Sequence, residues 1–136
     1  MEPQPTRFAL DAETARRIVA DDPTLGARRA LVGPAVLRSE VLSMLYREAR
    51  VGLLDDREAR SQLTGLATLR IRLLGDRVSR ATAWRIARQL AWDDVRLAEY
   101  LAVASLQADV IVTADERLIA AADGIIPVSS YEELLT

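Results

Sequence analysis

The sequence predicts an α/β protein built as a three-layer α/β/α sandwich around a central parallel sheet of about five strands. Short apolar and β-branched runs alternate along the chain with amphipathic helical patterns, as in proteins whose parallel strands are joined by helices. The strongest strand pattern, Asp109–Thr113, is almost continuously apolar, which is typical of a strand covered on both faces. With 136 residues and no linker or repeat, the chain is expected to form one domain over residues 1–136.

In the N-terminal half, a short apolar run is followed by three helical patterns. Pro23 ends the first of them because proline cannot continue a helix, whereas Pro34 is expected in the first turn of another. That helix is the clearest in the chain, since Leu37, Val41 and Leu45 recur at the spacing of a core-facing stripe. The predicted elements are strand Arg7–Leu10, helix Ala12–Ala20, strand Ala30–Val32, helix Pro34–Arg50 and helix Asp55–Leu69, with the last two antiparallel across a short loop.

In the C-terminal half, strand and helix patterns alternate more regularly. The order Arg, Ile, Arg, Leu, Leu over Arg70–Leu74 favours a strand near an edge of the sheet. The remaining predicted elements are helix Arg77–Leu90, helix Asp94–Leu106, strand Asp109–Thr113, helix Glu116–Ala122, strand Ile125–Val128 and a terminal helical turn, Ser130–Leu135.

The composition removes several kinds of chemistry. The chain has no cysteine and no histidine, which excludes Ser-His-Asp and Cys-His catalysis and zinc sites built on either residue. All eighteen basic residues are arginine, so neither a P-loop nor a Schiff-base lysine is available. A net charge of -2 argues against a broad basic surface for nucleic acid but leaves room for a local arginine rim. An enzyme with this inventory is expected to use carboxylates and a hard divalent cation.

The N-terminal residues Met1–Pro5 contain no apolar segment of the kind found in signal peptides. No apolar run approaches the roughly 20 residues that a membrane-spanning helix needs. The absence of cysteine suits a reducing compartment. The sequence therefore predicts a soluble, cytoplasmic protein with no membrane partner.

Two aspartates follow predicted strands directly. Asp11 comes after the first strand and Asp115 after Asp109–Thr113, with Thr113 on the same strand face as Asp115. In open parallel sheets, binding sites form outside the carboxyl ends of the strands, so neighbouring strands would bring both carboxylates into one crevice. The alternative is that each aspartate only caps the helix that follows it.

Glu40 is the third candidate acid. It lies on the Pro34–Arg50 helix at the border of the apolar stripe, where an unpaired carboxylate is costly to bury. The alternatives are a solvated side chain or an ion pair with Arg47.

Several segments together resemble PIN-domain ribonucleases, with toxins of the VapC type as the nearest relatives. The resemblance covers nearly the whole chain, from Phe8 to about Ser129. It is carried by Asp11, by Glu40 within Leu37–Leu42, and by the run Ala98–Ala104 leading into Val112–Asp115; the stretch Ile71–Arg77 and the turn Trp92–Asp94 are similar to an actinobacterial branch of that family.

The resemblance implies a PIN-like fold and a metal-dependent endoribonuclease, the toxin of a type II toxin–antitoxin pair. It implies that Asp11 and Asp115 hold Mg²⁺ or Mn²⁺ and that Glu40 is a direct or water-mediated ligand. It also implies an RNA substrate, a homodimer, and a cognate antitoxin whose C-terminal segment lies over the active site.

The sequence departs from the family pattern at Leu97. The family has an aspartate at this place, three residues before the tyrosine, and leucine has no lone pair for a metal. Asp94, one turn earlier, could substitute as a ligand or could instead cap the helix. Glu13 stands where the family often has a hydroxyl residue, and it could join the cluster or face solvent.

Three function hypotheses follow. The first is a VapC-like ribonuclease with reduced or absent activity. The second is a catalytically silent PIN-fold module retained to bind an antitoxin or RNA, which Leu97 favours. The third, a receiver-type signalling domain, requires a lysine opposite the acceptor aspartate, and this chain has none.

Arginines near the candidate acids are the expected RNA contacts. Arg38, Arg96 and Arg117 could each bind phosphate in a bidentate manner, although ordinary surface ion pairs are the alternative for any of them. Trp84 and Trp92 are expected to anchor a core or an interface. The Leu53–Leu69 region is the predicted contact for a second copy or an antitoxin.

Overall fold

The computed structural model describes residues 4–136 and contains a five-stranded, wholly parallel sheet. The strand order is β3-β2-β1-β4-β5. The chain therefore starts in the middle of the sheet, builds outward through β2 and β3, and then returns to the other side of β1. The strands are β1 Arg7–Leu10, β2 Ala30–Pro34, β3 Arg72–Leu74, β4 Val110–Val112 and β5 Val128–Ser129.

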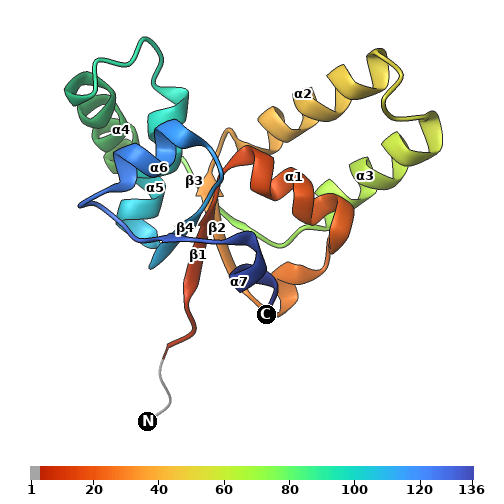
Figure 1. Cartoon of the computed structure of the whole chain (residues 1–136), viewed down its shortest axis with the longest axis horizontal. Helices are drawn as coiled ribbons and strands as arrows, with labels where there is room; N and C mark the ends of the chain where they lie inside the picture. Colours follow the sequence, from red (N-terminus) through yellow and green to blue (C-terminus); the bar gives the residue numbers. More distant parts are fainter. Residues whose placement is uncertain (1–3) are drawn as a thin grey trace.

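Helices cover both faces of this sheet, as Figure 1 shows. α1, α2 and α3 pack on one another on one side, and α2 and α3 form a long hairpin that projects from the molecule. α5 lies across β1 and β2 on the opposite side, and α4 and α6 pack against it. The helices are α1 Ala12–Asp21, α2 Leu37–Arg50, α3 Asp56–Thr68, α4 Arg77–Gln89, α5 Arg96–Gln107, α6 Glu116–Ala122 and α7 Tyr131–Leu135, with a 3-10 turn at Leu25–Ala27. The predicted three-layer α/β/α sandwich is confirmed.

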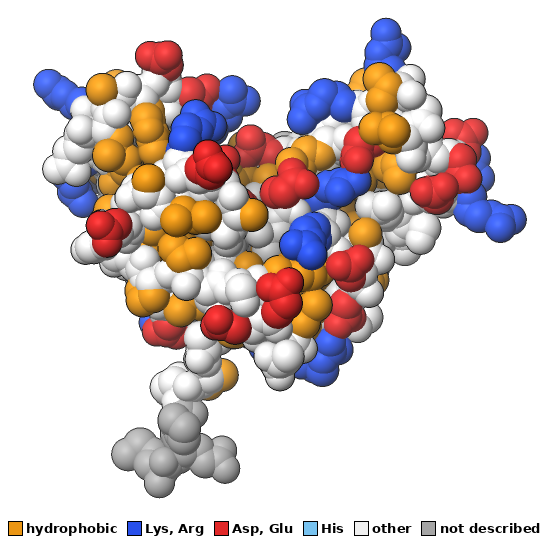
Figure 2. Space-filling view, viewed as in Figure 1, with side chains coloured by type: hydrophobic (Ala, Val, Ile, Leu, Met, Phe, Trp, Pro, Cys, Tyr) orange, Lys and Arg blue, Asp and Glu red, His pale blue; other side chains and the backbone are white. Residues whose placement is uncertain are grey.

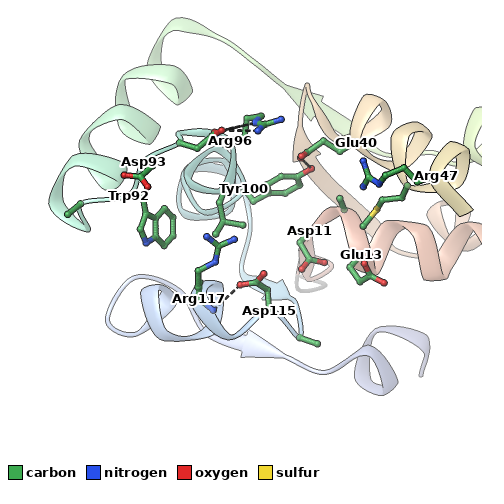
Figure 3. A pocket seen from close by; sticks show the side chains of 16 residues that line it. Asp11, Glu13, Glu40, Arg47, Trp92, Asp93, Arg96, Tyr100, Asp115 and Arg117 are labelled. Carbon is green, nitrogen blue, oxygen red and sulfur yellow. Dashed lines mark hydrogen bonds and ion pairs between the residues drawn. The ribbon is translucent and has the colours of Figure 1, made fainter.

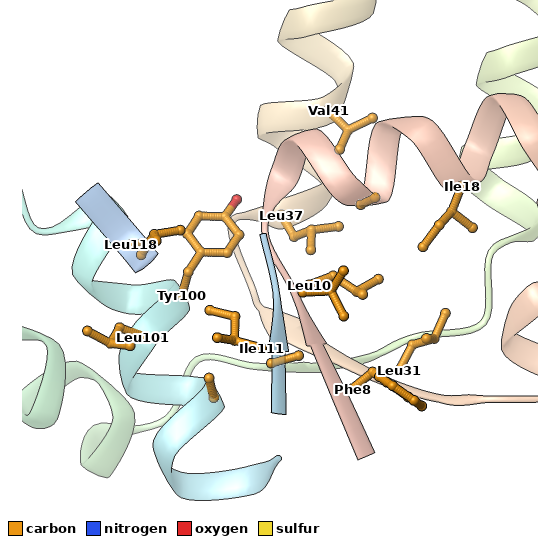
Figure 4. Packing of buried hydrophobic residues seen from close by; sticks show 14 of the residues in the cluster. Phe8, Leu10, Ile18, Leu31, Leu37, Val41, Tyr100, Leu101, Ile111 and Leu118 are labelled. Carbon is orange, nitrogen blue, oxygen red and sulfur yellow. The ribbon is translucent and has the colours of Figure 1, made fainter. Parts of the chain in front are cut away.

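The core is aliphatic, as the low aromatic content requires. Leu10 of β1 is buried on the face covered by Ile18 of α1, and Ile111 of β4 is buried on the face covered by Leu101 of α5 (Figure 4). Tyr100 is the one large aromatic side chain at the centre of this packing whose polar end reaches out of it. Burial of both faces explains why the strand over residues 110–112 has no polar alternation.

Some boundaries differ from the sequence prediction. Pro34 is the last residue of β2, paired with Leu74, and α2 begins at Leu37. A proline at a strand end removes no ladder hydrogen bond, so the strand extends further than the turn signal indicated. The last strand begins at Val128, because the amides of Ile125 and Ile126 bond to the carbonyl of Ala122 in a turn after α6.

No helix within residues 4–136 is both long and apolar enough to cross a membrane.

Candidate functional site

The sheet topology brings the two strand-end aspartates together. β1 and β4 are neighbours, with Leu10 opposite Val112, although the two strands lie at opposite ends of the chain. The order of the strands reverses between them, since β2 and β3 lie beyond β1 whereas β5 lies beyond β4. A crevice outside the carboxyl ends of two such strands is the usual ligand site of an open parallel sheet. Asp11 and Asp115 follow these two strand ends.

Asp11 is buried, and both of its carboxylate oxygens accept hydrogen bonds. Its Oδ1 accepts from the amide of Thr14 at 2.9 Å and so caps α1. Its Oδ2 accepts from the hydroxyl of Thr113 at 2.5 Å. The Thr113 hydroxyl in turn accepts from the amide of Asp115 at 3.0 Å, which links the two strand ends through one side chain. Thr113 and Asp115, expected on one strand face, both follow the end of β4 at Val112 and are joined by this hydrogen bond.

Asp115 is partly buried and caps α6. Its Oδ1 accepts from the amides of Arg117 and Leu118 at 2.9 and 3.0 Å. Its Oδ2 has no hydrogen-bond partner among residues 4–136. Each aspartate therefore caps the helix that follows it, as the capping interpretation expected. Both also line the crevice, Asp11 with both oxygens engaged and Asp115 with only Oδ1 engaged in the described chain.

Glu40 reaches the same crevice from α2. Its Oε1 accepts a hydrogen bond from the hydroxyl of Tyr100 on α5, so the carboxylate is held at the edge of the core. Burial, followed by the hydrogen bond to Glu40, raises the pKa of Tyr100 far above its ordinary value, and the phenol stays a donor. Tyr100 was not among the predicted site residues, because its partner lies sixty positions away in the sequence. Arg47, considered as a partner of Glu40, lines the crevice without forming an ion pair with it in the described chain.

These carboxylates line one open cavity of about 740 Å³ (Figure 3). The space-filling view shows the surface hollowed between the α2–α3 hairpin and the α4 side of the molecule (Figure 2). Six acidic residues and three arginines line it, so negative charge is in excess: Asp11, Glu13, Glu40, Asp93, Asp94 and Asp115 against Arg47, Arg96 and Arg117. Within residues 4–136, none of Asp11, Glu40 and Asp115 takes part in an ion pair.

The negative potential extends to Glu99, which lies one residue before Tyr100 on α5. Burial raises the pKa of its carboxyl above the ordinary value, and the charges of Glu40 and Asp94 raise it further. Arg80 and Arg96 lower this pKa without offsetting the burial and the two carboxylates.

Leu97 lies on the wall of the cavity, partly buried against the core. Asp94, considered as its replacement, is exposed and pairs with Arg96 through the backbone amide at 2.7 Å and the guanidinium at 2.8 Å. These hydrogen bonds to Arg96 hold the pKa of Asp94 below its usual range. Its carboxylate is thus engaged in the turn before α5, which begins at Arg96 rather than at Asp94. No group of three acidic side chains within residues 4–136 is already gathered at metal-ligand distances.

The predicted phosphate-binding arginines are divided by the fold. Arg117 and Arg96 line the crevice, although Arg96 is partly neutralised by Asp94. Arg38 does not line it: its guanidinium donates to the carbonyl of Leu69 at 2.7 Å in a separate cavity. Arg47 of α2, which the sequence analysis considered only as a partner for Glu40, is an exposed cation on the rim.

The turn after α4 forms one side of the rim. Ala91 has a positive φ of 55°, and the amide of Trp92 bonds to the carbonyl of Ala87 at 2.9 Å, which is the pattern of a Schellman motif. This turn places the partly buried Trp92 in the crevice wall. Trp84, expected in a core or interface, is not in the core: it is 65% exposed on α4. The same helix turns Ala83 and Ile86 into the core, so Trp84 lies on its outer side.

The fold and the crevice define an α/β protein with an acid-lined site at the switch point of a parallel sheet. The sequence matches no protein-family model and no curated protein. The structure is similar to a solved one, the crystal structure of PAE2754 from Pyrobaculum aerophilum, with a TM-score of 0.72 and 24% sequence identity over 97% of this chain and 96% of that one. This likeness extends over the whole fold and supports the architecture.

Proposed function

We propose that the chain is a PIN-type, metal-dependent endoribonuclease of the VapC kind, with catalysis limited by the loss of one acid at Leu97. The observation that carries the proposal is the meeting of three carboxylates without ion-pair partners, Asp11, Glu40 and Asp115, in one crevice at the switch point of the sheet. Carboxylate oxygens are the ligands that Mg²⁺ and Mn²⁺ prefer. With no histidine or cysteine in the chain, these oxygens are the available donors.

The residues present fit a divalent cation. Asp115 Oδ2 is free of partners in the described chain, and Glu40 is steadied by Tyr100 while its second oxygen remains available. A bound Mg²⁺ or Mn²⁺ would act as a Lewis acid toward a scissile phosphodiester and lower the pKa of a bound water. The chain itself would orient the ligands through Thr113 and Tyr100. Arg117 and Arg47 would hold RNA phosphates at the rim.

The proposed partners follow from the same site. An antitoxin segment would lie over the acid-lined crevice. A second copy of the chain would contact the apolar tip of the α2–α3 hairpin, where Tyr46, Val51 and Leu53 are 65%, 71% and 71% exposed. Leu53 belongs to the region that the sequence analysis predicted for such a contact.

The proposal is tested by RNA cleavage in Mn²⁺ together with calorimetric titration of Mn²⁺. Asp11→Asn is the informative variant, because asparagine can still cap α1 through its amide oxygen while losing the charge. It should weaken metal binding and cleavage by at least roughly 10- to 100-fold. Asp123→Asn, an exposed acid outside the crevice, is the matched control. If the native protein cleaves RNA and Asp11→Asn cleaves it equally well, the site is misassigned.

Leu97 favours a second candidate, a silent PIN-fold module retained for binding. Leu97→Asp adds a carboxylate to the crevice wall, and Leu97→Asn introduces the same bulk and polarity without the charge. If the site is an impaired nuclease, the Asp variant should bind Mn²⁺ more tightly and cleave faster than both the native protein and the Asn variant. A native protein that neither binds Mn²⁺ nor cleaves RNA supports the silent module.

A further inference from the structure

A second groove lies at the opposite end of the sheet from the acidic crevice. Its volume is about 600 Å³, and the first residues of three adjacent strands, Arg7, Ala30 and Arg72, line it. The crevice with Asp11 and Asp115 lies beyond the last residues of the strands, and the two cavities share no lining residue. The groove is lined by five arginines and by no acidic residue: Arg7, Arg29, Arg38, Arg70 and Arg72.

Four of these five guanidinium groups have no carboxylate partner within residues 4–136. Arg7 pairs with Asp109 at 3.4 Å and is the exception. Arg29 and Arg38 are partly buried, and main-chain carbonyls fix them: Arg29 donates to the carbonyl of Leu134 at 3.1 Å, and Arg38 donates to the carbonyl of Leu69 at 2.7 Å. A carbonyl orients a guanidinium without neutralising it, and each guanidinium has five N–H donors, so several remain free.

Arg70 and Arg72 are the remaining two of the five arginines that line the groove. They are exposed, lie on the segment entering edge strand β3, and make no side-chain hydrogen bond within the described chain. A concentration of positive charge is unexpected in a chain with a net charge of -2. Like charges in one concave site repel one another unless an anion neutralises them, and planar guanidinium groups match the oxygens of phosphate. Buried Leu31 and Val32 provide an apolar wall beside them.

We infer that this groove is a binding site for phosphate groups of a multiply charged anion, such as a nucleoside polyphosphate. The volume lies within the usual range for pockets that bind small ligands. Arg29 and Arg38 are the pre-positioned contacts, and Arg70 and Arg72 close on the ligand from the edge strand. The site is separate from the carboxylate crevice and does not depend on its activity.

Direct binding to the full chain tests this site, with inorganic pyrophosphate, ATP and a single-stranded oligonucleotide as three separate probes. The buffer contains EDTA, so no metal in the crevice contributes. The variant is Arg70→Ala/Arg72→Ala, whose exposed side chains make no ion pair or side-chain hydrogen bond within residues 4–136. The matched control is Arg57→Ala/Arg60→Ala, two exposed arginines of α3 outside the groove. We expect about tenfold weaker binding of the probes by the groove variant, because the ligand loses two charge-assisted contacts. The control variant should bind with native affinity.

The probes distinguish the source of the phosphate. Binding of pyrophosphate and ATP indicates a free polyphosphate ligand, whereas binding of the oligonucleotide alone indicates the phosphates of a nucleic-acid strand. Absence of binding for all three probes, or equal affinity in the groove variant and the control, overturns the proposal. Asp11→Asn should bind the probes as the native protein does, so a failure of the nuclease proposal leaves this result intact.

Discussion

Among single residues, Thr113 has the largest expected role in holding the site together, through its side-chain hydroxyl. It donates to Asp11 and accepts from the amide of Asp115, and Thr113 is buried. Thr113→Val keeps the shape but leaves the buried Asp11 oxygen and the partly buried amide of Asp115 without partners. We expect a loss of about 1–3 kcal/mol in the free energy of unfolding, measured by urea denaturation. Thr113→Ser should retain native stability, and an equally stable valine variant would contradict this role.

Residue patterns predicted the two strand-end acids but not every contact around them. Asp11 and Asp115 could be found because each follows a legible strand, and strand ends are where sites of parallel sheets lie. The hydrogen bond between Tyr100 and Glu40 could not be predicted from the sequence, because it depends on how α5 crosses the sheet relative to α2. Arg38 was expected near the acids because it is close to Glu40 in sequence, yet its long side chain extends to Leu69. Sequence proximity does not fix the direction of a flexible side chain.

At the scale of elements, the C-terminal end of α4 carries measurable strain. Ala91 occupies the left-handed position of the Schellman turn, where a Cβ costs about 1–2 kcal/mol and glycine is the usual residue. Ala91→Gly removes that cost but adds unfolded-state entropy. We therefore expect a net gain of up to about 1 kcal/mol in thermal or chemical denaturation. Ala81→Gly, at an exposed position inside α4, is the control and should be destabilising; a gain in both variants would argue against relief of strain.

Helices were predicted more accurately than strand boundaries. The α1 helix and the α2–α3 hairpin follow from amphipathic spacing and capping residues, such as Asp55 at the start of α3. The last strand could not be placed, because the segment Ile125–Val128 is apolar enough for a strand but its first two amides complete the turn after α6. A two-residue strand such as β5 is defined by its partner β4 rather than by its own sequence.

At the scale of the whole molecule, two tyrosines make stability sensitive to alkali. Tyr100 joins α5 to α2, and Tyr131 joins α7 to Asp21 of α1 at 2.8 Å. Burial, with the hydrogen bond to Asp21, raises the pKa of Tyr131 to about 12, and the pKa of Tyr100 is raised further. An unfolded tyrosine ionises at about 10. Above that pH the unfolded chain loses protons that the folded chain keeps, so the free energy of unfolding falls as pH rises.

Denaturation at a series of pH values from 8 to about 12 measures this dependence. The double variant Tyr100→Phe/Tyr131→Phe should show a shallower fall above pH 10 than the native protein. Tyr46→Phe changes an exposed tyrosine of α2 and should keep the native slope. Parallel pH profiles for the native protein and the double variant would mean that these phenols ionise equally in both states.

The strand order is the feature of the whole molecule that the sequence left open. Alternating strands and helices predict a parallel sheet, but several orders satisfy that pattern, and only the packing of β4 against β1 produces a shared crevice. That pairing depends on burying Leu10 against one helix layer and Ile111 against the other. It is therefore a property of the assembled core.

The hydrogen bond from Thr113 to Asp11 joins residues 102 positions apart, so the acidic crevice closes almost the entire chain into a loop. A cation bound between Asp11 and Asp115 would form a reversible link between β1 and β4, the first and the last strand to enter the centre of the sheet. Cation binding would then stabilise the chain against global unfolding, and would slow proteolysis that depends on it. A chain in which β4 has not yet formed has Asp11 in place but not Asp115, so it has no cation site.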